Sequence, residues 1–338
     1  MDDVKVIIDW VSLTVHDSSH YEIIKMLGLD LTNFKQTQPR LSYQYAVGFE
    51  DIVITWGGNA GTHLIMSGDG CRAFELLSHR TFSEFFQLLF DGYERVNFTR
   101  IDLAIDDKRA LGKNNSLKLT TLAKKISKGE CDTKIKNYDH IKGNQGETLY
   151  IGSRESETFY RFYDKRAQVI KKNKGEMDEL PNNWIRYEIE IKGKKANELA
   201  NIIASEEMEV GAIAFGILKE SLRFVKKRDD ETPVKECETW RPWASFLREV
   251  QPLKLSSEKK ESTIEDMRRW FDTLARAVYI MREAYGLNYI WELSEKGKDK
   301  LSEIDRENLA NFKADYLEDY QRMSEDHYFN NRLNLQDI

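Results

Sequence analysis

The stretch "RIDLAID", residues 100–106, alternates charged and apolar residues with a period of two. In a β-strand, successive side chains point to opposite faces of the sheet. The alternation therefore places Arg100, Asp102 and Asp106 on one face and three aliphatic side chains on the other. The sequence predicts a strand with one polar face and one face that packs on a core.

Two later stretches repeat this pattern and extend the polar face. In "RYEIEIK" the polar face carries Arg186, Glu188, Glu190 and Lys192. In "FYRFYDK" it carries Arg161, Tyr163 and Lys165, with Phe159. If the three strands share a sheet, one surface holds four carboxylates, several cations and a tyrosine hydroxyl.

The order of the remaining segments predicts the fold class. Residues 4–15 are rich in β-branched side chains, and short strand-like runs with Gly-rich turns follow up to residue 67. Residues 81–93 form an amphipathic helical pattern, after which strands return. This order predicts an α+β domain with a mainly antiparallel sheet. "VIIDWVSLTV" and "FTRIDLAIDD" each hold an aspartate inside an apolar strand, which suggests a duplicated sheet unit.

The C-terminal part has a helical pattern instead. The segment 262–286 begins with a capping-box pattern, Ser262 and Glu265, and continues with apolar residues at steps of three and four. We therefore expect an α+β domain over residues 1–215 and a mostly helical region over residues 216–338.

Composition limits the class of protein. No apolar run among the 338 residues approaches the roughly 20 that a membrane span needs, and the first residues lack a signal-peptide pattern. Cys71, Cys131 and Cys237 lie far apart, as expected of reduced thiols. We expect a cytoplasmic protein without a membrane partner. The net charge of −6 argues against a general nucleic-acid coat protein, although cations are dense between residues 108 and 174.

Two interpretations of the polar face are open at this point. Grouped carboxylates without His or Cys select hard ions such as Mg²⁺ or Mn²⁺, and a tyrosine flanked by cations that favour phenolate can attack a phosphate. Neighbouring Arg or Lys side chains would stabilise the charge of the transition state. The alternative is an ordinary amphipathic sheet whose solvent face carries ion pairs of small energetic value.

Four blocks of sequence resemble the Rep_trans family, which comprises rolling-circle plasmid replication initiators and the MOBT relaxases of integrative conjugative elements. In chain order the blocks are "FTRIDLAIDD", "TLYIGSRES", "FYRFYDK" and "RYEIEIK". The resemblance implies site-specific nicking of one DNA strand at an origin. In this reaction, as the resemblance implies it, a tyrosine stays attached to the 5′ phosphate and leaves a free 3′ hydroxyl. The family's R-x-Y-x-K block matches residues 161–165, so Tyr163 is the implied nucleophile.

The strand faces and the resemblance together assign expected roles. The catalytic set is Tyr163, Arg161 and Lys165; the pool of metal ligands is Asp102, Asp106, Glu188 and Glu190; the DNA-binding set is Arg100, Arg154, Arg186 and Lys192. The expected cofactor is Mg²⁺ or Mn²⁺.

The expected partners follow from the same function. They are origin DNA, single-stranded or as a supercoiled duplex, and a host helicase, because the sequence has no phosphate-binding loop of its own. A conjugative coupling protein is a further candidate. The sequence leaves open whether the chain serves a plasmid, a conjugative element or a phage, and the competing function is a nicking-inactive DNA regulator on the same fold.

Overall fold

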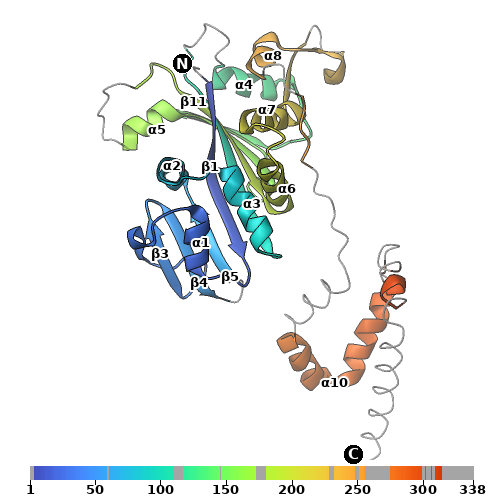
Figure 1. Cartoon of the computed structure of the whole chain (residues 1–338). Coiled ribbons are helices and arrows are strands. Elements are labelled where there is room, and N and C mark those ends of the chain that lie inside the picture. Colours follow the sequence, from blue (N-terminus) through green and yellow to red (C-terminus); the bar gives the residue numbers. More distant parts are fainter. Residues whose placement is uncertain are drawn as a thin grey trace, which may run out of the picture. The chain divides into compact units, whose positions relative to one another are not determined.

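The computed structural model describes two compact units. Contacts divide the chain into Met1–Ser257 and Glu258–Ile338 (Figure 1). The described residues are 4–58, 61–109, 117–144, 146–172, 180–227, 232–247, 251–255, 275–298, 301, 306 and 309–313.

The first unit is built on a sheet of ten antiparallel strands, which confirms the predicted α+β class with a mainly antiparallel sheet. Its order is β2-β3-β4-β5-β1-β6-β11-β10-β9-β8. The strands are β1 (Val4–Val15), β2 (Lys35–Gln36), β3 (Tyr45–Phe49), β4 (Ile52–Gly58), β5 (Gly61–Met66), β6 (Val96–Asp107), β8 (Tyr138–Gly143), β9 (Gly146–Ile151), β10 (Thr158–Asp164) and β11 (Ile185–Lys192). A small second sheet has the order β13 (Glu238–Thr239), β12 (Arg223–Lys226), β7 (Cys131–Asp132).

The connectivity of the large sheet repeats. In the first half β1 is followed by helix α1 and by β3, β4 and β5, and β5 returns to pair with β1. In the second half β6 is followed by α4 and by β9, β10 and β11, and β11 returns to pair with β6. The two long strands β1 and β6 pair antiparallel at the centre. This is the connectivity that a duplicated sheet unit predicts.

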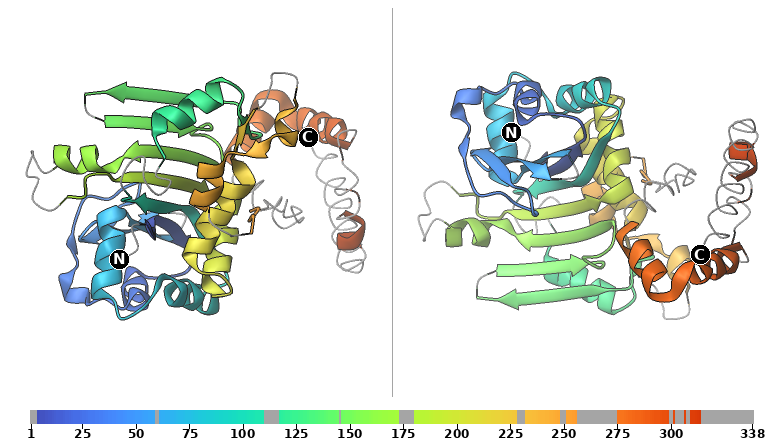
Figure 2. Two further views of the ribbon diagram at one scale, coloured as in Figure 1. Left: turned by 90° about the horizontal axis from the view of Figure 1, so that it is seen from above. Right: turned by 90° about the horizontal axis from the view of Figure 1, so that it is seen from below.

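Helices cover the apolar face of the sheet. Figures 1 and 2 show α3, α6 and α7 packed along this face, and their apolar side chains join those of β1, β6, β10 and β11 in one core. The opposite face carries the polar side chains. The helices of this unit are α1 (His20–Leu27), α2 (Gly68–Leu77), α3 (Phe82–Gly92), α4 (Leu119–Ser127), α5 (Lys165–Lys172), α6 (Gly193–Ala204), α7 (Val210–Ser221) and α8 (Arg241–Leu247), with 3₁₀ turns at Leu31–Asn33 and Val234–Glu236.

The first unit extends beyond the boundary expected after residue 215. That position lies inside α7, and a helix in mid-course cannot separate two domains. Leu218, Phe224 and Trp243 are fully buried in the same core as the sheet. The apolar side chains that follow residue 215 therefore complete the core of the α+β unit.

The described part of the second unit is helical, as its sequence pattern predicts. Helix α10 (Ala275–Lys298) is interrupted at Gly286, whose φ of 79° and ψ of 170° are not helical. Residues 262–274 of the predicted helix lie outside the described residues. Several large apolar side chains of α10 are exposed, among them Tyr285 and Trp291. Among the described residues, no helix combines the length and the apolar character needed to cross a membrane.

Candidate functional site

The strand register brings the three polar stretches onto one surface. In the sheet β11 lies between β6 and β10. Arg186 lies opposite both Asp106 and Tyr163, and Glu188 lies opposite Arg161. Because paired residues point to the same side of a sheet, these five side chains share one face. The arrangement expected from the period-two alternation is therefore present.

This face is hollowed at Tyr163. A cleft of about 680 Å³ is lined by Asp102, Glu188, Arg161 and Tyr163, with Lys165, Trp10 and the first residues of α2 around them. A second hollow, of about 220 Å³, begins on the other side of Tyr163 and is lined by Thr148 and Tyr150 of β9. Tyr163 thus lines both hollows.

Two cations flank the ring of Tyr163. The Arg161 guanidinium carbon lies 5.2 Å from the ring centroid and the Lys165 ammonium nitrogen 5.8 Å. Tyr163 is only 6% exposed. Burial raises the pKa of its phenol, and the negative charge of Glu188 raises it further, against the opposing effect of Arg186 and Arg161. Arg161 thus favours phenolate, as expected, but burial and the charge of Glu188 outweigh this effect on the pKa.

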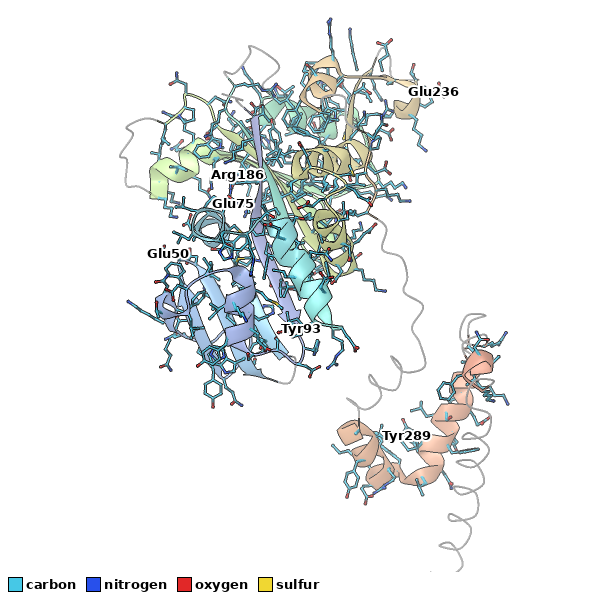
Figure 3. The ribbon with its side chains drawn as sticks, viewed as in Figure 1. Glu50, Glu75, Tyr93, Arg186, Glu236 and Tyr289 are labelled. Atoms are coloured by element: carbon cyan, nitrogen blue, oxygen red, sulfur yellow. The ribbon has the colours of Figure 1, made fainter. Side chains whose placement is uncertain are left out.

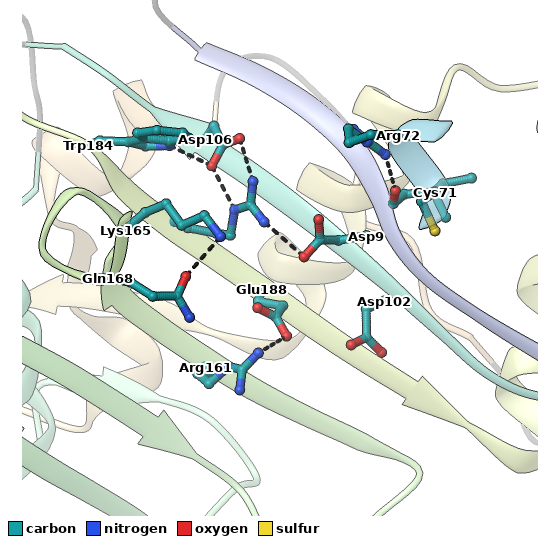
Figure 4. A network of polar contacts seen from close by, with 12 residues as sticks. Asp9, Cys71, Arg72, Asp102, Asp106, Arg161, Lys165, Gln168, Trp184 and Glu188 are labelled. Carbon is teal, nitrogen blue, oxygen red and sulfur yellow. Dashed lines mark hydrogen bonds and ion pairs between the residues drawn. The ribbon is translucent and has the colours of Figure 1, made fainter. Parts of the chain in front are cut away.

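Asp106 belongs to a buried network rather than to the cleft. Its two oxygens accept hydrogen bonds of 2.8 Å from the Arg186 guanidinium, and Oδ1 also accepts one of 2.7 Å from the Trp184 indole (Figure 4). Arg186 also donates to Asp9 Oδ2 at 2.8 Å. Figure 3 shows Arg186 in the interior of the first unit. Burial alone would raise the pKa of Asp106, but Arg186 holds it below its ordinary value. These two residues therefore act as a rigid brace between strands.

Asp102 and Glu188 are the carboxylates that stay oriented toward the cleft. They are 2% and 3% exposed. Glu188 accepts a hydrogen bond from Arg161 through Oε1, whereas its Oε2 is buried without a partner. Burial raises the pKa of Asp102 to about 7, and the charges of Glu188 and Glu190 act in the same direction, against Arg100. Both oxygens of Asp102 accept hydrogen bonds from Arg100, whereas Glu188 keeps one unpartnered oxygen for a divalent cation.

The structure brings together fewer carboxylates than the sequence pattern suggested. Among the residues that the structure describes, no three His, Cys, Asp or Glu side chains form a group that could hold a metal ion. Glu190 forms ion pairs of 2.8 Å with Arg100 and 2.9 Å with Lys192, beside the cleft. Of the four predicted metal ligands, Asp102 and Glu188 line the cleft, and Arg100 would have to release Asp102 before that carboxylate could bind an ion.

Of the four predicted DNA-binding residues, Arg100 lines the cleft, whereas Arg154, Arg186 and Lys192 do not. Arg100 packs over the Trp10 ring at 4.7 Å and holds the Asp102 carboxylate. Arg154 lies over Tyr150 at 5.2 Å, and Lys192 donates to the Arg154 carbonyl oxygen. Arg186 is fully engaged by two carboxylates, which makes it a positioning residue rather than a free phosphate ligand.

The sequence interpretation missed Asp9 and the start of α2. Asp9 lies at a β-bulge of β1, between the paired residues Ile8 and Trp10. The bulge turns its carboxylate toward Arg186 and the cleft. Gly68 allows α2 to begin here, because a β-carbon at this position would lie 3.2 Å from Asp9 Oδ1. "SGDG", residues 67–70, therefore opens a helix, whereas the sequence suggested only a turn. An aspartate inside the apolar stretch "VIIDWV" was the available signal.

The raised pKa of Asp102 gives a stability prediction. The pKa of this carboxyl is about 7 in the native state and near 3.8 in the unfolded state. The free energy of unfolding therefore falls as pH rises through this interval, because the native state holds the proton more tightly. Asp102→Asn removes this loss. In chelator, the variant should gain stability relative to the parent at about pH 8 and gain less or none at about pH 5. Urea unfolding at the two pH values measures this, and an equal effect at both would contradict it.

Comparisons with known proteins agree with the geometry. A family model described as "Replication initiation factor" (Rep_trans) matches residues 96–304, and one described as "Rolling Circle replication initiation protein N-terminal domain" matches residues 5–91. The first match includes β6, β10 and β11, and the second includes β1 to β5. Together the two models cover both halves of the ten-stranded sheet.

One relative and one solved structure are similar over more than half of the chain. "Putative DNA relaxase NicK" of Bacillus subtilis (strain 168) is 30% identical over 224 residues, which cover 63% of this chain and 60% of that relative's length. The rolling circle replication initiator protein from Geobacillus stearothermophilus superposes with a TM-score of 0.65 at 29% identity, covering 75% of this chain and 98% of that chain.

Proposed function

Because the chain belongs to the Rep_trans family of replication initiation factors, we propose that it nicks and rejoins one strand of origin DNA through Tyr163. The observation that carries this proposal is the position of Tyr163. Its ring lies between Arg161 and Lys165 in a cleft that also holds Asp102 and Glu188. A nucleophile, two cations for the phosphate and two carboxylates for a metal ion are thus in one place.

The proposed reaction is a phosphoryl transfer. The Tyr163 oxygen attacks the scissile phosphorus, the bond to the 3′ oxygen breaks, and the 5′ phosphate becomes attached to the tyrosine. The phenol loses its proton and the departing 3′ oxygen gains one, which leaves a 3′ hydroxyl. The attack of that hydroxyl on the phosphotyrosine reverses the reaction and rejoins the strand. Arg161 and Lys165 are placed to donate hydrogen bonds to the non-bridging oxygens, where negative charge grows.

Asp102 and Glu188 are the proposed ligands of Mg²⁺ or Mn²⁺. A bound divalent ion polarises a phosphoryl oxygen and offsets negative charge. The chain's own residues hold these ligands in position, because both carboxylates are buried and Arg161 donates a hydrogen bond to one oxygen of Glu188. Since Glu188 raises the pKa of Tyr163, neutralising that charge would also make the phenol easier to deprotonate.

The test uses supercoiled plasmid carrying the DNA that flanks the gene. With Mg²⁺ we expect open circles that carry protein on the 5′ end of the nick. Excess chelator should abolish the nicking and leave binding in a gel-shift assay largely unchanged, because it removes the metal ion and leaves the cations that contact phosphate in place. Cleavage that continues undiminished in chelator would refute the metal site.

The same assay distinguishes the proposed nicking function from the competing one, a nicking-inactive DNA regulator. A protein that shifts this DNA but gives no covalent adduct with Mg²⁺ or with Mn²⁺ would be a nicking-inactive regulator. Within the proposed function, a host helicase separates the strands and, for a conjugative element, a coupling protein is a further partner. Co-purification from the host would identify either one.

A further inference from the structure

A third hollow lies on the polar face of the sheet, in its N-terminal half. Its volume is about 570 Å³. Thr14 of β1, His63 of β5 and Thr99 of β6 line it from the sheet, and Tyr43 and Gln44 line it from the segment that precedes β3. None of these residues takes part in the nicking chemistry described above.

This hollow and the nicking cleft open on the same face. Along β1, Trp10 is paired with Asp102, Ser12 with Arg100 and Thr14 with His63. Side chains two residues apart point to the same side, so one row of β1 side chains runs from the cleft to the hollow. Trp10 lines the cleft and Thr14 lines the hollow. The four intervening steps of about 3.3 Å place the two openings about 13 Å apart along the strand.

The polar side chains that line the hollow carry no formal charge. The His63 ring is hydrogen-bonded on both sides, at 2.8 Å to Thr14 Oγ1 and at 3.2 Å to Ser12 Oγ. Burial lowers its pKa to about 4, so the imidazole is neutral at physiological pH. The other polar side chains of the lining are hydroxyls and one amide. Neutral donors and acceptors suit the edge of a nucleobase, whereas a phosphate would require cations.

An aromatic wall completes the hollow. The Tyr43 ring is stacked against the His63 ring, with centroids 5.9 Å apart and planes inclined by 16°. The two residues before Tyr43 are held in the left-handed region, Leu41 with φ 56° and Ser42 with φ 64°. Residues other than glycine adopt this conformation at a cost, and such strain is concentrated at ligand-binding segments. The segment is thus preformed at the edge of the hollow.

We propose that this hollow binds one unpaired base of the DNA strand, several nucleotides away from the phosphate at Tyr163. The proposal rests on the proposed nicking function, because it takes the ligand to be the same strand. The base stacks on Tyr43, and its edge meets Gln44 and the threonine hydroxyls. Stacking would fix the position of the DNA strand along the β-sheet, so that one particular phosphate reaches Tyr163.

The test compares two oligonucleotides of equal length and charge, an oligothymidine and a wholly abasic oligomer. Binding is measured by fluorescence anisotropy in chelator, with full-length protein carrying Tyr163→Phe so that no cleavage occurs. Adding Tyr43→Ala should weaken binding of the oligothymidine about tenfold, the usual effect of losing one base–aromatic stack. The affinity for the abasic oligomer should change by less than about twofold. Equal weakening of both oligomers would overturn the proposal.

Tyr45→Ala is the matched control. Tyr45 is 54% exposed, packs on Trp56 with ring centroids 5.8 Å apart, and does not itself line the hollow. This variant should not change the ratio of the affinities for the oligothymidine and the abasic oligomer.

A second measurement keeps the site intact. An oligothymidine that carries 5-iododeoxyuridine is photo-crosslinked to the Tyr163→Phe protein, and the attached peptide is identified by mass spectrometry. We expect crosslinks at Tyr43, and crosslinks confined to other regions would overturn the proposal. Nicking is scored separately on the supercoiled plasmid, so a chain that nicks but shows no base dependence refutes only this inference. A chain that binds the base but does not nick refutes only the proposed function.

Discussion

Replacing Tyr163 with phenylalanine should abolish the covalent protein–DNA adduct and leave the fold intact. The ring packs between Arg161 and Lys165, and phenylalanine keeps that ring while removing only the attacking oxygen. We expect a loss of nicking of more than about 10³-fold, as for other nucleophile deletions. Nicking is measured on supercoiled origin plasmid, the adduct on denaturing gels and the fold by circular dichroism.

Three neighbouring tyrosines serve as controls. Tyr160 and Tyr187 are fully buried on the apolar face of the sheet, and Tyr150 lines the second hollow beside Tyr163. The phenylalanine variants of all three should retain the adduct. The buried hydroxyl of Tyr187 has no hydrogen-bond partner, so Tyr187→Phe should not reduce stability. Mass spectrometry of the nuclease-trimmed adduct decides the assignment, because a nucleotide on any tyrosine other than Tyr163 would refute it.

The candidate site was predictable where it depends on strand alternation. The period of two placed Tyr163, Glu188 and Asp102 on the polar faces of their strands, and the register shows that β10, β11 and β6 are direct neighbours. Alternation is a local property of the backbone, so a few residues suffice to show it. The fold class followed for the same reason from the order of such strands.

Features that depend on burial or on irregular backbone were not predictable in this way. A β-bulge interrupts the alternation at Asp9, and only the register reveals which way that carboxylate points. Asp106 and Glu188 look alike in sequence, but Asp106 is occupied by Arg186 and Trp184 whereas Glu188 keeps a free oxygen. The raised pKa of Tyr163 results from burial outweighing nearby cations, a balance that no sequence pattern contains.

Glu188→Gln should separate binding from chemistry. Glutamine keeps the size of the side chain and an oxygen that can accept from Arg161, and it removes the negative charge proposed to hold the metal ion. We expect nicking with Mg²⁺ to fall at least about 100-fold, whereas DNA binding persists or strengthens because a negative charge has left the cleft. Calorimetric titration of Mn²⁺ should show the loss of metal binding directly.

Glu190→Gln is the matched control, since Glu190 lies two residues further along the same strand and face but pairs with Arg100 and Lys192. Its effect on nicking should be several-fold at most. The direction of the Glu188→Gln effect also separates two roles. The charge of Glu188 raises the pKa of Tyr163, so if this carboxylate did nothing except oppose phenolate formation, removing its charge would make nicking faster. A faster variant would therefore exclude Glu188 as a metal ligand, whereas a slow variant with lost Mn²⁺ binding would assign it that role.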